Sequence, residues 1–250
     1  LDFMHIFDDW GFSALQNNVN AQGQLWIGTQ AGLYVWELDA PRGQFIHHQI
    51  GDRLGIADGF IRQLYFDRTG VLWIGTRLGG ISRLTPQAAR FHLLNQAQGL
   101  MRDDVVMSLA KFDDQLWLGS ADGAISQIDL AQPKVKQWRP LSEIGQDLGV
   151  IVDIEQDAKG NVWFASNRGL AKYQLEQDKF EFYTIKGPNG QLDNYISQLF
   201  MFKGTLWIAS ARFGLARYDQ ANDDFVFLEQ GQVTLGNVSS AMVSGDQLWL

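Results

Sequence analysis

The sequence predicts an all-β fold made of one repeated four-stranded unit, and two observations support this. A phrase of the type Leu-Trp-Ile-Gly-Thr recurs through the 250 residues, with its tryptophans 47, 44, 46, 44 and 42 residues apart. Four short β-type runs lie between successive copies. A four-stranded unit of about 40–45 residues that repeats along a chain is typical of a β-propeller blade. The tryptophans of the phrase are Trp26, Trp73, Trp117, Trp163, Trp207 and Trp249.

The segment around Trp163 shows the unit most clearly. Residues 150–154 are mostly apolar, as expected of a strand buried on both faces. After a turn at Gly160, residues 161–165 form a second run, and residues 170–173 and 179–183 alternate apolar and polar side chains. Hydrophobicity thus falls from the first run to the fourth, which predicts strands that radiate from a central axis. The tryptophan would fill the wedge between adjacent sheets, and the small residue two positions later would let the sheets approach closely.

The repeat also sets the expected boundaries. Five whole blades are predicted at residues 11–50, 57–96, 102–140, 147–185 and 193–230, followed by the first two strands of another blade at 236–250. Residues 1–8 resemble the outer strands and would belong to a preceding blade. Because both ends interrupt a unit, we expect a slice of a longer protein with a single propeller domain. The complete ring is predicted to have seven blades, with six as the alternative.

Composition excludes several function classes. The net charge is −8, from 28 acidic and 20 basic side chains, and no Lys/Arg run exceeds two residues, so no nucleic-acid partner is expected. The absence of cysteine rules out disulfides, thiolate catalysis and Cys-ligated metal. No apolar run approaches the roughly 18 residues of a membrane span, so any membrane contact would come from other segments. No cofactor is predicted.

The composite motif Asp67-Arg-Thr-Gly70-Val-Leu-Trp73-Ile-Gly-Thr76-Arg-Leu-Gly79 resembles the two-component regulator propeller repeat. The basic-aromatic endings at residues 169–173 and 214–218 match that family's pattern, whereas Gly79-Gly80 and Gly123-Ala124 depart from it. The resemblance implies a periplasmic sensor region of a hybrid histidine kinase or a membrane-anchored diguanylate cyclase. Such a region is not catalytic in itself, and its output domain follows a membrane span.

Function is expected in the loops that follow each tryptophan phrase, because loops differ between copies of a repeat. Three of these loops carry Arg77, Arg168 and Arg212, which could bind carboxylate or phosphate groups bidentately. Asp122 in a fourth loop, with Arg102 and Asp193 between blades, completes the predicted site for a small-molecule or oligosaccharide ligand. The alternative is that the arginines are solvated or pair with inter-blade acids, namely Asp103, Asp104, Asp147 and Asp193.

Three other functions are alternatives to ligand sensing: metal binding, catalysis and protein interaction. His47 and His48 point to opposite faces of a regular strand, so no metal site is predicted there, and Asp113-Asp114 and Asp223-Asp224 lack a calcium-loop spacing. A propeller enzyme that resembles streptogramin lyase would need a general base, and no histidine falls in the predicted ligand loops. A protein-interaction platform, or a homodimer formed through the full-length protein, could instead use exposed aromatics. The candidates are Trp36, Trp138 and Phe213, for which packing beneath a neighbouring loop is the alternative.

Overall fold

The computed structural model describes most of the chain, and its residues divide into two compact units. One unit comprises residues 1–120 and 126–137, and the other comprises residues 121–125 and 138–250. The described residues are 14–20, 22–37, 40–41, 43–49, 55–85, 92–94, 105–132, 134–140, 147–188, 190–193, 195–228, 238 and 240–250. Within them, no helix is long and apolar enough to cross a membrane.

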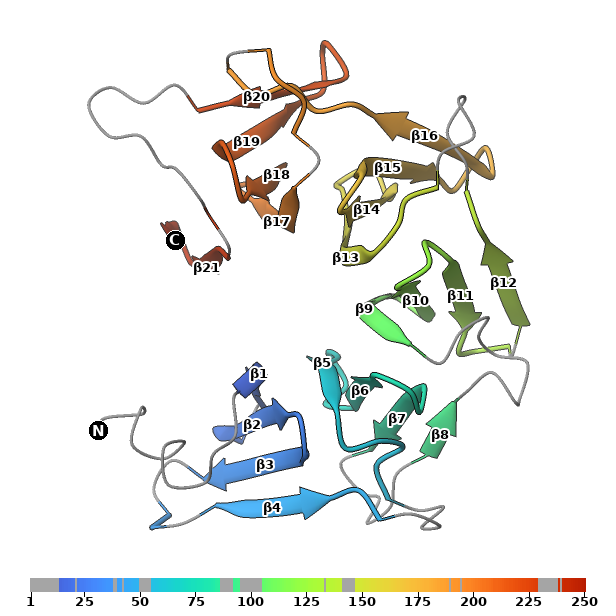
Figure 1. Cartoon of the computed structure of the whole chain (residues 1–250), viewed down its shortest axis with the longest axis vertical. Coiled ribbons are helices and arrows are strands. Elements are labelled where there is room, and N and C mark those ends of the chain that lie inside the picture. The colour runs from blue at the N-terminus through green and yellow to red at the C-terminus, as the bar shows by residue number, and fades with distance from the viewer. Residues whose placement is uncertain are drawn as a thin grey trace. The chain divides into compact units, whose positions relative to one another are not determined.

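The described strands form five four-stranded antiparallel sheets and one two-stranded sheet, and strands adjacent in sequence pair within each (Figure 1). The first sheet contains β1 (Ala14–Val19), β2 (Gln24–Thr29), β3 (Gly32–Glu37) and β4 (Gln44–His47), and the second β5 (Ile61–Phe66), β6 (Leu72–Thr76), β7 (Ile81–Leu84) and β8 (His92–Leu94). The third contains β9 (Val106–Phe112), β10 (Gln115–Ser120), β11 (Ile125–Asp129) and β12 (Lys134–Trp138). The fourth contains β13 (Ile151–Gln156), β14 (Val162–Ser166), β15 (Gly169–Gln174) and β16 (Lys179–Tyr183). The fifth contains β17 (Ile196–Phe202), β18 (Thr205–Ser210), β19 (Gly214–Asp219) and β20 (Asp224–Phe227), and β21 (Met242–Ser244) pairs with β22 (Gln247–Trp249).

These sheets confirm the predicted four-stranded antiparallel blades. Each tryptophan phrase forms the second strand of its sheet, and the four runs predicted around Trp163 coincide with β13 to β16. The last pair lies within the predicted range 236–250, and its inner strand begins at Met242. The predicted strand within residues 1–8 lies outside the described residues.

The predicted fall of hydrophobicity from the first strand to the fourth is wrong in one respect. The second strands are the most buried, since all five residues of β6 and of β14 are buried. The first strands β5 and β13 have only two buried positions of six. A first strand is hydrogen-bonded to a neighbour on one side only, so it is an edge strand, whereas the second strand is flanked on both sides.

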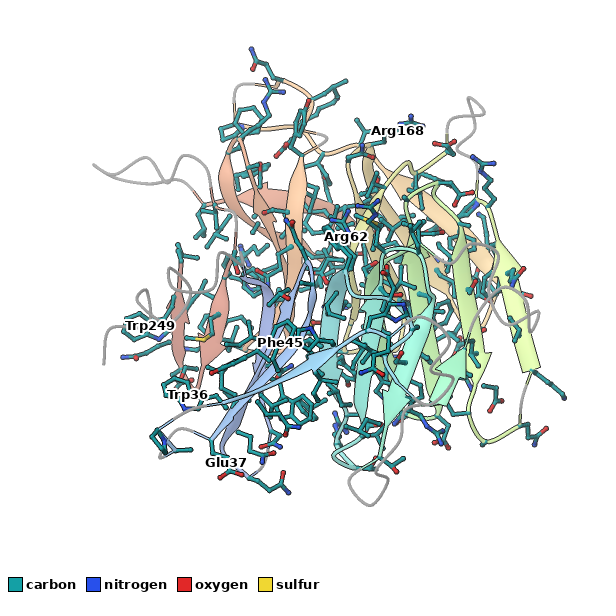
Figure 2. All side chains as sticks on the ribbon, turned by 60° about the horizontal axis from the view of Figure 1, so that its bottom comes forward. Trp36, Glu37, Phe45, Arg62, Arg168 and Trp249 are labelled. Carbon is teal, nitrogen blue, oxygen red and sulfur yellow. The ribbon has the colours of Figure 1, made fainter. Side chains whose placement is uncertain are left out.

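Within each compact unit, motif tryptophans pack against the next sheet along the chain. The ring of Trp163 in β14 lies 4.9 Å from that of Tyr218 and 5.6 Å from that of Phe225, both in the fifth sheet. Trp26 meets Phe66 of the second sheet edge-on at 5.8 Å. These contacts confirm the predicted wedge. Trp249, by contrast, is 56% exposed and projects from β22 (Figure 2).

The indole N–H of a buried tryptophan needs an acceptor, and the preceding turn supplies it in two sheets. Asp67 accepts hydrogen bonds from the backbone N–H groups of Thr69 and Val71 with Oδ1, and from Trp73 Nε1 at 3.1 Å with Oδ2. Asp157 accepts from Trp163 Nε1 at 2.8 Å in the same way. This explains the acidic residue six positions before the tryptophan.

The first sheet has an asparagine at that position. Asn20 uses Oδ1 for the turn and donates Nδ2 to the Gln24 side chain, so it offers no second oxygen to the indole. Trp26 Nε1 is accordingly buried without a hydrogen-bond partner among the described residues.

The small residue of the phrase faces the next inner strand. A Cβ atom on Gly28 would lie 2.5 Å from Ile61 Cγ2 in β5, and one on Gly75 would lie 2.8 Å from Val106 Cγ1 in β9. Both distances are well below van der Waals contact, so these glycines set how closely consecutive sheets approach.

We predict that Gly28→Ala lowers the free energy of unfolding by about 1–3 kcal/mol, because the added methyl overpacks the contact with Ile61. Urea unfolding followed by tryptophan fluorescence measures this change. Gly59→Ala is the matched control, since its Cβ would meet its nearest neighbour, Ala31 O, at 3.4 Å. Equal stability of the two variants would contradict the role assigned to Gly28.

We also predict opposite effects for a reciprocal pair of substitutions. Asp67→Asn should cost about 1–3 kcal/mol, because an amide N–H₂ replaces the oxygen that accepts from Trp73. Asn20→Asp should instead stabilise the chain by about 1 kcal/mol, because it gives Trp26 Nε1 an acceptor. Both values come from urea unfolding at pH 7, and a destabilised Asn20→Asp variant would refute the explanation.

Candidate functional site

The hydroxyl residue that ends each tryptophan phrase fixes the loop that follows it. Thr29 Oγ1 donates to Gly32 O at 2.8 Å and accepts from the N–H groups of Ala31 and Gly32. Thr76 and Ser166 make the corresponding bonds in the second and fourth sheets, and Ser210 accepts from two loop N–H groups in the fifth. The loops predicted to bind ligand are therefore held by local hydrogen bonds of the repeat itself.

Arg168 lies in the β14–β15 loop, at the end of the fourth sheet where Figure 2 labels it. Its guanidinium forms an ion pair with Asp147, and Arg139 lies 3.5 Å from the other oxygen of that carboxylate. Pairing with an inter-blade acid, which was the alternative for this residue, is thus what the structure contains.

Arg212, in the β18–β19 loop, contacts the connection that precedes β17. It donates to Leu192 O at 3.4 Å, and its guanidinium lies 5.7 Å from the centre of the Tyr195 ring. Asp193 in the same connection is fully buried. Its Oδ1 accepts from Tyr195 N at 3.2 Å, while its Oδ2 has no hydrogen-bond partner among the described residues.

The other described site residues, Arg77 and Asp122, contact neighbouring groups. Arg77, which belongs to the other compact unit, stacks on Phe60 at 5.2 Å from the ring centre. Asp122 accepts from Ala124 N at 3.0 Å within its own turn. Arg102 lies outside the described residues. Among the described residues of the second unit, Arg168 and Arg212 contact different groups, and the ligand-binding role of the predicted residues stays a prediction.

The aromatics considered as interface anchors are packed within the chain. Trp36 is 7% exposed and donates to Ala40 O at 2.9 Å. Trp138 lies against Tyr173 and Phe180, and Phe213 packs edge-on against Phe227. Nowhere in the described ranges do three His, Asp or Glu side chains lie close enough together to hold a metal ion.

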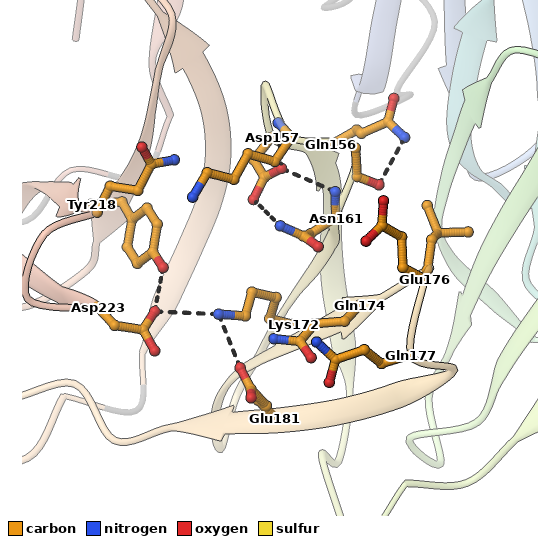
Figure 3. A pocket seen from close by; sticks show the side chains of 14 residues that line it. Gln156, Asp157, Asn161, Lys172, Gln174, Glu176, Gln177, Glu181, Tyr218 and Asp223 are labelled. Atoms are coloured by element: carbon orange, nitrogen blue, oxygen red, sulfur yellow. Dashed lines mark hydrogen bonds and ion pairs between the residues drawn. The ribbon is translucent and has the colours of Figure 1, made fainter.

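A polar cleft of ≈ 690 Å³ opens at the other end of the fourth and fifth sheets (Figure 3). Three turns line it: the β13–β14 turn, the β15–β16 turn and the β19–β20 turn. Because consecutive strands are antiparallel, these turns lie at the sheet ends opposite the β14–β15 and β18–β19 loops. Sequence reasoning searched only those loops and missed this cleft.

Lys172 forms the floor of the cleft and ties the two sheets together. Its ammonium lies 2.9 Å from Glu181 and 3.2 Å from Asp223 of the fifth sheet (Figure 3). It donates to the Tyr183 hydroxyl. It also lies 5.3 Å from the centre of the Trp163 ring. Although burial alone would lower the pKa of Lys172, the hydrogen bonds to Glu181 and Asp223 raise it above its usual value.

Asp223 is the acceptor shared by this cluster. Tyr218 and Tyr183 both donate their hydroxyls to Oδ1, the latter at 2.8 Å. Burial opposes ionisation of Asp223, but the bonds from Tyr218, Tyr183 and Lys172 outweigh it and lower its pKa. Burial and the Asp223 hydrogen bond together raise the pKa of Tyr218 to about 12. The cluster therefore keeps its charges and protons throughout the physiological pH range.

A partly buried carboxyl, that of Asp153, joins the inner strands of the same two sheets. Asp153 in β13 accepts from Leu199 N in β17 at 2.7 Å and from Ile154 N at 2.9 Å. Gln198 occupies the equivalent position of β17, since the two residues pair with Ala165 and Ala209 respectively, and it accepts from Ala241 N at 2.6 Å. Burial raises the pKa of Asp153 to about 7.

Residues 55–77, which include β5, β6 and the Asp67 turn, match the family model described as two component regulator propeller. These residues are therefore similar to one copy of the two component regulator propeller repeat. No curated protein sequence matches the chain.

Several solved structures are similar to this chain in the arrangement of their sheets, at low sequence identity. The extracellular domain of BT3049 from B. thetaiotaomicron, described as a hybrid two component system, aligns with a TM-score of 0.73 at 19% identity, over 92% of this chain and 31% of that one. PorZ, a surface component of the type-IX secretion system of Porphyromonas gingivalis, aligns with a TM-score of 0.68 at 17% identity, over 95% of this chain and 39% of that one. Virginiamycin B lyase from Staphylococcus aureus, in an inactive form with quinupristin, aligns with a TM-score of 0.65 at 13% identity, over 89% of this chain and 71% of that one. These similarities establish the fold. The chain spans well under half of the length of the first two proteins.

Asp153 makes the free energy of unfolding of this chain depend on pH in a testable way. An unfolded aspartate ionises near pH 3.8, whereas folded Asp153 ionises near pH 7. Between these values the folded state binds more protons, so this carboxyl lowers the free energy of unfolding as pH rises. Asp153→Asn should remove that contribution, so its stability relative to the parent rises between pH 5 and pH 8. Urea unfolding at each pH measures the difference.

Gln198→Glu is the reciprocal variant, because it places a carboxyl at the equivalent inter-sheet contact. It should add a loss of stability over the same pH range. If Asp153→Asn leaves the slope of stability against pH unchanged, the assignment of the raised pKa to Asp153 is wrong.

Proposed function

We propose that this chain is part of the periplasmic, ligand-sensing input region of a bacterial transmembrane signalling protein. The output domain would be a histidine kinase or a diguanylate cyclase located beyond a membrane span. The observation that carries the proposal is the match of residues 55–77 to the two component regulator propeller model. The similarity of the sheets to the extracellular domain of BT3049 supports it at the level of fold.

The proposed mechanism is non-catalytic. The fourth and fifth sheets are joined by the buried Trp163 and by Lys172 and Asp153, which bond across the junction. A ligand that binds one packing of two sheets more tightly than another shifts the equilibrium between them by that difference in affinity. The shift would then pass to the output domain through the rest of the protein or through a homodimer.

The enzymatic alternative rests on the fold of virginiamycin B lyase. A fold hosts many functions, so the likeness does not transfer activity to this chain. The alternative has a direct test, which is mass spectrometry of a streptogramin incubated with the purified chain. A linearised product would favour the lyase over the sensor.

We predict that the full-length protein shows output that depends on a small external ligand. Autophosphorylation or cyclic-di-GMP synthesis in membrane vesicles, measured against a panel of small acids and neutral saccharides, provides the readout. A protein whose output stays constant across the panel, or that has no output domain beyond a membrane span, would refute the proposal.

The predicted loop site has its own variant in that assay. If the ligand is anionic, replacing Arg77, Arg168 and Arg212 by alanine should raise the half-maximal ligand concentration at least tenfold, a loss of about 1.4 kcal/mol. Arg217→Ala is the control, since Arg217 lies within strand β19 rather than in a loop. A triple variant with an unchanged response would exclude the loops as the sensing site.

A further inference from the structure

We propose that the cleft between the turns at residues 157–161, 174–177 and 220–223 binds a neutral, hydroxyl-rich ligand such as a short oligosaccharide. The inference concerns binding, and it holds whether or not binding is passed on as a signal. The cleft volume of ≈ 690 Å³ falls within the ~300–1,000 Å³ of small-molecule sites.

Four of the charged side chains that line the cleft already bind groups of the chain itself: Asp157, Lys172, Glu181 and Asp223. Lys172 is bound by Glu181, Asp223 and the Tyr183 hydroxyl. Asp157 accepts the indole N–H of Trp163 and three N–H groups of its own turn. A charged ligand would have to displace these partners. An anion would also meet four lining carboxylates against only two ammonium groups, which disfavours acidic ligands.

Carboxamides supply the remaining hydrogen-bonding capacity. Five of the lining side chains are carboxamides, and each offers both donors and an acceptor: Gln156, Asn161, Gln174, Gln177 and Gln220. Sugar hydroxyls likewise donate and accept, so the two sets of groups are complementary. In Asn161 the N–H₂ group is bound to Asp157, which leaves its oxygen directed to other donors.

Gln174 provides the most specific observation. The Gln174 side chain lines the cleft, and its Oε1 is buried without a hydrogen-bond partner among the described residues. Leaving such an acceptor unpaired costs about 1–3 kcal/mol. A ligand hydroxyl at this position would satisfy it, so the free site contains an acceptor that a hydroxyl-bearing ligand completes.

The lining also argues against a peptide ligand. Leu175 and the Tyr218 ring are its main apolar elements, whereas peptide grooves rely on apolar pockets that anchor side chains. The lining of the cleft comes from both the fourth and the fifth sheets. A ligand that spans Gln174 and Gln220 would therefore touch both sheets and be sensitive to their packing.

Isothermal titration of the purified chain tests the proposal with three probe classes: neutral trisaccharides, oligogalacturonates and spermidine. We expect binding of at least one neutral saccharide and at least tenfold weaker binding of the charged probes. Gln174→Leu and Gln220→Leu should each weaken saccharide binding at least tenfold without lowering the melting temperature. Gln191→Leu, which removes a carboxamide outside the cleft, should leave binding unchanged.

Three results would overturn the proposal: preference for a charged probe, no saccharide binding below about 1 mM, or saccharide binding that both cleft variants leave unchanged. The last result separates the cleft proposal from the proposed sensor function. If the full-length protein responds to a saccharide whose binding ignores the cleft variants, the sensor function stands and the cleft assignment falls. If the cleft binds saccharide but output never changes, the reverse is true.

Discussion

The packing of motif tryptophans such as Trp26 and Trp163 onto the next sheet is the interaction on which the rest of this structure depends. A large ring buried between two sheets is stabilised by three features of its surroundings. Its N–H needs an acceptor, which Asp67 and Asp157 provide from the preceding turns. The residue two positions later must be small, as Gly28 shows against Ile61. A cation over the ring, such as Lys172 over Trp163, adds attraction from the ring quadrupole. The packing of the tryptophan therefore explains most of the residues of the repeat motif.

Much of the fold could therefore be predicted from the sequence. The spacing of the tryptophans identified the second strands, and the turn residues located β13 to β16. The burial gradient failed because hydropathy reports how apolar a run is and not how many strands flank it. Residues 150–154 are mostly apolar, as in a strand buried on both faces, yet β13 is an edge strand and only its Ile151 and Ile154 are buried.

The candidate site was less predictable, for a physical reason. Periodicity places residues within a sheet, but partners across sheets are distant in sequence, as with Lys172 and Asp223, which are 51 positions apart. Lys172 and Tyr218 were visible as parts of the basic-aromatic endings of the repeat, and Asp223 was visible as part of an acidic pair. Nothing in a single repeat signalled that they meet. The arginine loops drew attention because they vary, yet Arg168 is already paired with Asp147.

The cleft is linked to the proposed function by Lys172 and Asp223. These two side chains line the cleft and also hold the fourth and fifth sheets together. Hydrogen–deuterium exchange of the chain, with and without a bound neutral saccharide, tests this most directly. The account predicts slower exchange in the turns at residues 157–161, 174–177 and 220–223, and in strands β13 and β17 at the junction they share. Protection confined to the loops around Arg77, Arg168 and Arg212, with no change in those turns, would contradict it.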